Sequence, residues 1–127
     1  MKSLSFLFLM IFSATAFAMT EVICDGRQSG KRVVIEVDGR FGGSYFRDAI
    51  LAITDSAGVV TRTRHNLTYR APWGGSRRMT YEGAELRLEV DTWPDQVPQW
   101  QRPYFGTAYV RALNSYVQVN CRYPNIH

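Results

Sequence analysis

The sequence has few of the residues that build most catalytic and metal centres. Its 127 residues include two cysteines and two histidines, and these form no Cys-x-x-Cys pair and no His-Glu-x-x-His string. Gly-x-Ser-x-Gly and phosphate-binding glycine loops are also missing. We therefore expect no metal site and no cofactor. Helical periodicity is scarce as well, which argues against a helical bundle.

Long hydrophobic runs are missing except at the start of the chain. Lys2 precedes a largely apolar run from Leu4 to Phe12, and Ala16-Phe17-Ala18 follows. This order of basic, apolar and small residues predicts a secretory signal peptide over residues 1–18. The run is shorter than the roughly 20 residues that a membrane-spanning helix needs, so we expect no transmembrane anchor. Residues 19–127 are predicted to form a single secreted or periplasmic domain.

Both cysteines lie within residues 19–127, one near each end. Export to an oxidising compartment favours their pairing, so we expect a disulfide between Cys24 and Cys121. The bridge would span 121 − 24 = 97 residues. For a loop of that size the chain-entropy model gives a stabilisation of roughly 4 to 5 kcal/mol.

Alternation of apolar and polar residues dominates the exported part. Because successive side chains of a strand point to opposite faces, this alternation predicts half-buried strands. The inward faces of the clearest runs are Val33, Ile35 and Val37; Ala84, Leu86, Leu88 and Val90; Val117, Val119, Cys121 and Tyr123; and, across residues 59–70, Val59, Thr61, Thr63, His65, Leu67 and Tyr69. We predict an all-β fold, either a small antiparallel sandwich or a barrel of about seven or eight strands.

Residues typical of turns separate these runs, as in 38–43, 55–58 and 114–115. The inward-facing residues are odd-numbered before Gly83, at Met79 and Tyr81, and even-numbered after it, from Ala84 onward. This change of parity predicts a bulge or a tight turn at Gly83. Residues 46–54 are apolar on both faces, and the turn beside them favours a strand over a short helix. Residues 92–105 hold three prolines and no periodicity, so we predict a loop.

Net charge is mild but unevenly placed. Without Lys2 it falls from +4 to +3, which is weak for a nucleic-acid binder, and no zinc-finger, RRM or helix-turn-helix pattern occurs. Nucleic acid is therefore not the expected partner. Residues 59–81 carry five arginines and no acidic residue: Arg62, Arg64, Arg70, Arg77 and Arg78.

Two interpretations of these arginines are open. If their strands pair with the acidic residues 82–95, they form cross-strand ion pairs, which is the simpler interpretation. Alternatively, they form a strip that binds an anionic ligand, because the planar guanidinium captures phosphate or carboxylate through two hydrogen bonds.

The three tryptophans, Trp73, Trp93 and Trp100, lie outside the clear strands. Beside polar neighbours, such side chains can stack on sugar rings or anchor a protein partner. They can also fold back as a plug over a barrel end, and the high average burial of tryptophan favours the plug.

An enzymatic interpretation has less support. Small secreted ribonucleases use an acid, a base and a phosphate-binding arginine. The residues that could supply these roles here are His65, one of Arg64 and Arg70, and one of Glu82 and Glu85. A lone histidine on a strand is more often a packing residue, so we assign no catalytic residue.

The layout is similar to that of small periplasmic lysozyme inhibitors, which are exported, all-β and bridged from an early strand, here VICDG, to a late one, here VNCRY. Their inhibitory loop reads Ser-Gly-x-x-Tyr. The nearest string here, residues 75–81, has a different order, so no inhibitory residue is carried across.

We therefore predict a non-catalytic binding domain for a glycan, an anionic ligand or a protein partner. The predicted contacts are the three tryptophans and the five arginines. Two alternatives stay open, an inhibitor of a cell-envelope hydrolase such as lysozyme and a small secreted hydrolase or ribonuclease that uses His65.

Overall fold

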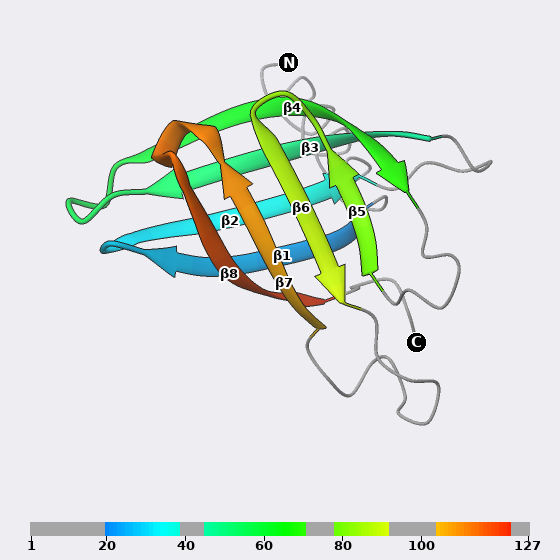
Figure 1. Ribbon diagram of the computed structural model, residues 1–127. Coiled ribbons are helices and arrows are strands. Elements are labelled where there is room, and N and C mark those ends of the chain that lie inside the picture. Colours follow the sequence, from blue (N-terminus) through cyan, green and yellow to red (C-terminus); the bar gives the residue numbers. More distant parts are fainter. Residues whose placement is uncertain (1–19, 39–44, 71–77, 92–103, 123–127) are drawn as a thin grey trace, which may run out of the picture.

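The computed structural model describes residues 20–38, 45–70, 78–91 and 104–122, which form a closed antiparallel barrel (Figure 1). Its strands are β1 (Thr20–Gln28), β2 (Lys31–Asp38), β3 (Phe46–Thr54), β4 (Val60–Arg70), β5 (Arg78–Glu82), β6 (Leu86–Asp91), β7 (Tyr104–Val110) and β8 (Ser115–Arg122), with a 3-10 turn η3 (Arg111–Leu113) before β8. Each strand pairs with its neighbours in sequence order, and β8 pairs with β1. The all-β prediction is confirmed, and the barrel, not the sandwich, is the observed form.

The core fills the barrel interior with the apolar side of the predicted alternation. On β2, β6 and β8 the inward positions are those expected from the sequence, and all are buried: Val33, Ile35, Val37, Leu86, Leu88, Val90, Val117, Val119 and Cys121. Residues 46–54 form a strand, as predicted, and Ala49 and Leu51 point into the same core. Burial of these apolar side chains is the main stabilising term of the fold.

Three details differ from the expectations. Ala84 is exposed, because residues 83–85 form the turn between β5 and β6, in which Gly83 N donates to Leu86 O at 2.9 Å. The parity change at Gly83 is therefore a turn. Tyr104 and Phe105, predicted as part of a loop, begin β7, where Tyr104 is buried. Residues 60–64 are exposed on both faces of β4 despite their alternation.

The first and last strands are joined by the predicted disulfide. Cys24 and Cys121 lie directly opposite each other in the β1–β8 register, with 4.0 Å between their Cα atoms, and both are buried. Gly26 permits this close pairing, because a Cβ atom there would lie 2.3 Å from Gln118 O. A larger residue at position 26 would push the two strands apart.

The two halves of the barrel differ in extent (Figure 1). Strands β1 to β4 form two long hairpins whose tips project at one side, and strands β5 to β8, of which β5 to β7 are shorter, cross them. The connections 39–44, 71–77 and 92–103 lie outside the described residues, as does Tyr123, which is predicted to point inward. Within the described ranges, no helix has the length and the apolar character that crossing a membrane would require.

Replacing both bridged cysteines should destabilise the barrel. In the Cys24→Ala/Cys121→Ala variant, the long closed loop is released, so we expect the free energy of unfolding to fall by about 2 to 5 kcal/mol. Urea unfolding followed by circular dichroism measures this change. A double variant as stable as the native protein would contradict the role assigned to the bridge.

Candidate functional site

The described arginines of the predicted strip lie on the outer faces of two neighbouring strands, β4 and β5. Arg62, Arg64 and Arg70 occupy the outer face of β4, whereas Arg78 lies on β5. Arg77 and the tryptophans Trp73, Trp93 and Trp100 lie outside the described residues, so their assignment to a binding site stays a prediction.

Arg78 is held by carboxylates across the β5–β6 pair. Its Nε donates to Asp91 Oδ1 at 3.0 Å and its Nη1 donates to Glu89 Oε2 at 3.1 Å. For this residue the interpretation as a cross-strand ion pair is confirmed. It is wrong for Arg62 and Arg64, because β4 lies between β3 and β5, and these two arginines face Ala52 and Ile50 of β3.

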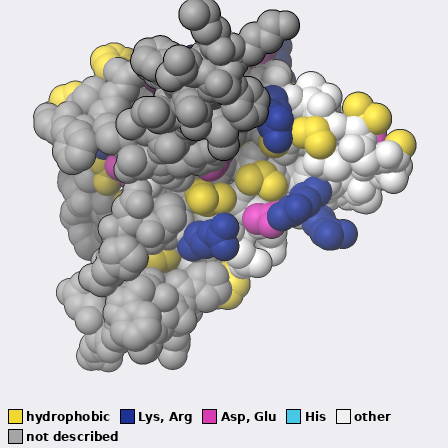
Figure 2. Space-filling view, turned by 180° about the vertical axis from the view of Figure 1, so that it is seen from behind, with side chains coloured by type: hydrophobic (Ala, Val, Ile, Leu, Met, Phe, Trp, Pro, Cys, Tyr) yellow, Lys and Arg dark blue, Asp and Glu magenta, His cyan; other side chains and the backbone are white. Residues whose placement is uncertain are grey.

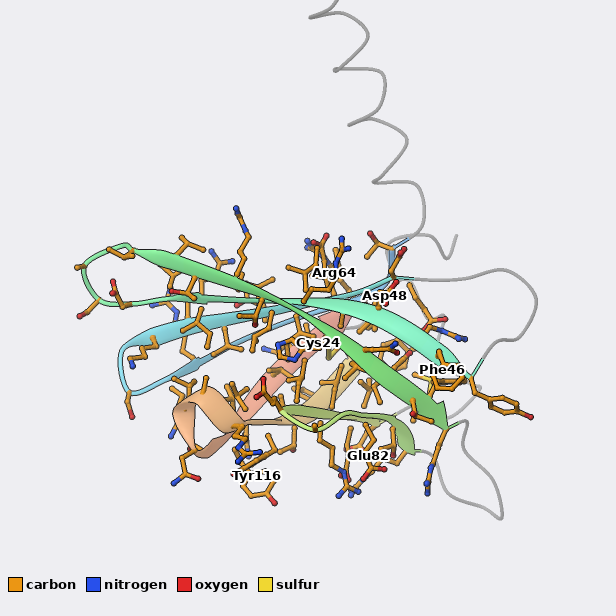
Figure 3. All side chains as sticks on the ribbon, turned by 90° about the horizontal axis from the view of Figure 1, so that it is seen from above. Cys24, Phe46, Asp48, Arg64, Glu82 and Tyr116 are labelled. Carbon is orange, nitrogen blue, oxygen red and sulfur yellow. A yellow bond between two sulfur atoms is a disulfide. The ribbon has the colours of Figure 1, made fainter. Side chains whose placement is uncertain are left out.

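Three of the side chains proposed to act with His65, those of Arg64, Arg70 and Glu82, lie on the other face of the sheet. His65 lies on the inner face of β4, where its Nε2 is 2.7 Å from Thr63 Oγ1. Arg64 and Arg70 differ from it in parity and so point outward, as does Glu82, which pairs with the outward residue Thr68. Figure 3 shows Arg64 and Glu82 well apart. In the described ranges, no His, Cys, Asp and Glu side chains group as metal ligands.

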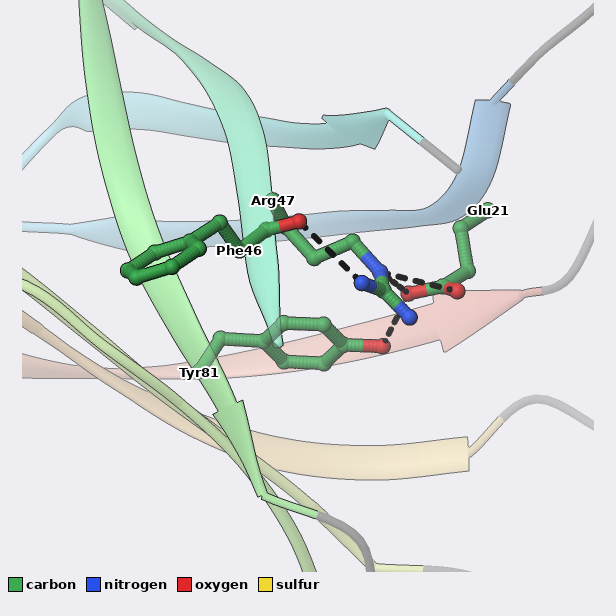
Figure 4. A network of polar contacts seen from close by, with 4 residues as sticks. All are labelled: Glu21, Phe46, Arg47 and Tyr81. Atoms are coloured by element: carbon green, nitrogen blue, oxygen red, sulfur yellow. Dashed lines mark hydrogen bonds and ion pairs between the residues drawn. The ribbon is translucent and has the colours of Figure 1, made fainter. Parts of the chain in front are cut away.

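A polar cluster that sequence reasoning missed lies inside one end of the barrel (Figure 4). Arg47, on the inner face of β3 and only 6% exposed, donates from Nε to both carboxylate oxygens of Glu21 at 3.3 Å. Tyr81 OH donates to Glu21 Oε2 at 2.7 Å, and the Arg47 guanidinium lies over the Tyr69 ring, 4.9 Å from its centroid. The Glu21–Arg47 ion pair and its contacts with the two tyrosines therefore connect four strands, β1, β3, β4 and β5.

A β-bulge brings Glu21 into this cluster. The β1–β2 register shifts between Thr20 and Val22, which adds an unpaired residue and re-aims its side chain. Val22 is buried, yet Glu21 next to it also reaches Arg47 and Tyr81. Burial raises the pKa of Tyr69, and the Glu21 carboxylate adds to the rise. Since these groups satisfy one another, the cluster serves to close the barrel end.

A hollow lies on the outside of the barrel, where β1 meets β8. This β1–β8 groove has a volume of about 640 Å³, and its lining includes the side chains of Ile23, Asp25, Arg27, Arg32, Val34, Gln118, Asn120 and Arg122. Seen from behind, the molecule shows basic side chains on both sides of an acidic one, next to hydrophobic side chains (Figure 2). The groove thus combines a partly apolar floor with charged and amide groups.

Its three arginines are not equivalent. Arg32 holds Asp25 by two hydrogen bonds, Nε to Oδ1 at 3.2 Å and Nη2 to Oδ2 at 2.8 Å. This hydrogen bonding keeps the pKa of Asp25 below its usual value, and the charges of Arg32, Arg27 and Arg122 contribute to the lowering. Within the described chain, Arg27 and Arg122 form no ion pair, so two guanidiniums stay available beside a neutralised pair.

A second, smaller hollow adjoins the first across β8. This β7–β8 groove, about 340 Å³, shares Gln118 and Asn120 with the β1–β8 groove and adds Asp91, Phe105 and Thr107. Phe105 lies opposite Asn120 and is 55% exposed. The two grooves therefore form one continuous surface with amides in the middle, an aromatic ring on one side and arginines on the other.

Sequence reasoning missed this surface because its members are far apart in the chain. Arg27 and Arg122 are isolated charges on strands that the sequence reveals by their apolar faces. Only the pairing of β1 with β8 places both arginines in the lining of one groove. The alternation in the sequence indicates that Gln118, Asn120 and Arg122 point outward. Alternation does not indicate which strand lies beside the strand that carries them.

Comparison of the chain with protein-family models, curated proteins and solved structures found no match. The groove itself therefore carries the functional argument. Available guanidiniums bind carboxylate, sulfate or phosphate, and the side-chain amides both donate to and accept from hydroxyl groups.

Removing the charge of Arg47 should destabilise the barrel. We expect Arg47→Met to lower the free energy of unfolding by about 2 to 4 kcal/mol, because it leaves the Glu21 carboxylate partly buried without its cation. Tyr81→Phe, which removes one hydrogen bond, should cost about 1 kcal/mol. Urea titration of both variants gives the comparison.

The Glu21→Leu/Arg47→Met double variant is the control, since it removes both charges and should recover much of the lost stability. If Arg47→Met unfolds at the native urea concentration, the ion pair does not hold the barrel end.

Proposed function

We propose that this protein is an exported, non-catalytic binding domain that holds an anionic glycan in the β1–β8 groove. The observation that carries the proposal is the pair Arg27 and Arg122, two guanidiniums without a described carboxylate partner that flank the amides of Gln118 and Asn120. An acidic sugar chain presents the matching groups, negative charges spaced by hydroxyls.

The adjoining β7–β8 groove favours a sugar over a small inorganic anion. Phe105 offers an exposed aromatic ring, on which a sugar ring can stack, and Thr107 offers a hydroxyl. A ligand several units long would cross β8 from the arginines to Phe105. A free phosphate would use only the arginine side. Nucleic acid is disfavoured because a net charge of +3 without Lys2 gives a weak attractive field.

Export is part of the proposal. The basic, apolar and small segments of residues 1–18 support removal of a signal peptide. The buried Cys24–Cys121 bridge supports folding in an oxidising compartment, where disulfides form and persist. Secretion or delivery to the periplasm would place the domain among the acidic glycans of a cell surface.

Binding should depend on the charge of the ligand and on the two available arginines. We expect oligogalacturonate or heparin oligosaccharides to bind and maltohexaose, a neutral glycan, not to bind. In Arg27→Gln/Arg122→Gln the affinity for the acidic ligand should fall on the order of 10-fold or more, and it should weaken steeply with salt. Isothermal titration calorimetry measures both effects.

The matched control is Arg62→Gln/Arg64→Gln, which removes the same charge from β4 and should keep the native affinity. If this control loses binding and the groove variant does not, the predicted arginine strip, not the groove, is the site. Equal binding of neutral and acidic glycans would overturn the electrostatic basis of the proposal.

Asp25 should oppose ligand binding. Its carboxylate is the one negative charge that lines the described β1–β8 groove, so Asp25→Asn frees Arg32 and adds a third available guanidinium. We expect this variant to bind oligogalacturonate several-fold more tightly, by the same titration. A weaker affinity would mean that the Asp25–Arg32 pair orients the site.

A further inference from the structure

Strand β4 is covered by β5 along only part of its length. Residues 60–68 all pair with β3 on one side, whereas the pairs with β5 are limited to Thr68, Tyr69 and Arg70. Beyond Thr68 the β5 chain turns at Gly83 into β6. Among the residues that the structure describes, the stretch 60–65 therefore has no strand on its second side.

The hydrogen-bonding pattern identifies the uncovered backbone groups. Asp55 N donates to Val59 O at one end of the β3–β4 ladder, and Tyr69 N donates to Tyr45 O at the other. Because backbone groups in an antiparallel ladder alternate in direction, odd-numbered residues of β4 turn theirs toward β3. The N–H and C=O groups of Val60, Arg62 and Arg64 consequently point to the uncovered side.

The side chains at this edge are positively charged. Arg62 and Arg64 are exposed on the outer face and lie opposite Ala52 and Ile50, while Asp48 of β3 lies opposite Asn66 instead. Within the described part of the chain neither arginine forms an ion pair. On the inner face, the intervening Thr61 and Thr63 are also exposed.

These charges select the kind of strand that can pair here. If two copies joined antiparallel about Thr63, Arg62 of each would lie opposite Arg64 of the other, and like charges directly opposite destabilise a sheet. A foreign strand with acidic side chains at alternate positions would meet both arginines favourably and would fill the uncovered backbone groups. Arginine at a sheet edge thus discourages self-association and favours an acidic partner.

We propose that the uncovered edge of β4 binds an extended acidic segment of another protein by strand addition, with its backbone on Val60, Arg62 and Arg64. Two of its acidic side chains, two residues apart, face Arg62 and Arg64, and the residue between them lies beside Thr63. Main-chain bonds supply affinity and the alternate side chains supply specificity. This surface is separate from the β1–β8 groove.

The probe is a short peptide with glutamate at alternate positions and threonine between them, titrated into the full chain. Hydrogen exchange should show new protection of the amides of Val60, Arg62 and Arg64, with Ser56 and Ala57 in the hairpin turn unchanged. The lysine version of the peptide should not bind, and the glutamate peptide N-methylated on its backbone should bind on the order of 10-fold more weakly, because it cannot complete the ladder.

The Arg62→Glu/Arg64→Glu variant should reverse the preference and bind the lysine peptide, with a change of roughly 10-fold in each direction. The matched control Arg27→Gln/Arg122→Gln should bind the glutamate peptide as the native chain does, which separates this test from that of the glycan groove. Protection located at the groove, equal binding of both peptides, or a dimer in sedimentation velocity that forms through β4 without peptide would overturn the proposal.

Discussion

The pairing of the first strand with the last is the constraint on which the rest of the molecule depends. β1 and β8 share only four residue pairs, from Ile23 with Arg122 to Gly26 with Val119. The buried Cys24–Cys121 bridge lies within this short ladder, and Gly26 permits the backbones to approach. If β1 and β8 did not pair, the strands would form an open sheet with two uncovered edges, and the apolar core would be exposed to solvent.

The shortness of that ladder also shapes the outer surface. Beyond Gly26 the described register between β1 and β8 ends, and the β1–β8 groove lies along their meeting line. Strands β4 and β5 are likewise joined by few residue pairs, three in all among the described residues. The two proposed binding surfaces thus lie where neighbouring strands share the fewest residue pairs, β1 with β8 and β4 with β5. Incomplete pairing leaves side chains and backbone groups accessible at both places.

The same residue type has different roles in this barrel according to its neighbours. Arg47 is buried and closes one end through Glu21. Arg78 and Arg32 are neutralised by carboxylates on adjacent strands. Arg27 and Arg122 flank a neutralised pair and form no ion pair with the described residues, which is why the proposed glycan site rests on them. Counting arginines along the chain cannot separate these roles, because each depends on which strand lies alongside.

The sequence alone determined what depends on neighbours in the chain. Period-two alternation assigned the inward faces of β2, β6 and β8, since a strand turns successive side chains to opposite sides regardless of its partners. The parity change located the turn at Gly83, and the number of cysteines together with the predicted signal peptide indicated the bridge. The tertiary structure decided which strands meet and in which register. That choice rests on packing between distant segments, and it alone brought Glu21 to Arg47 and placed Arg27 and Arg122 in the lining of one groove.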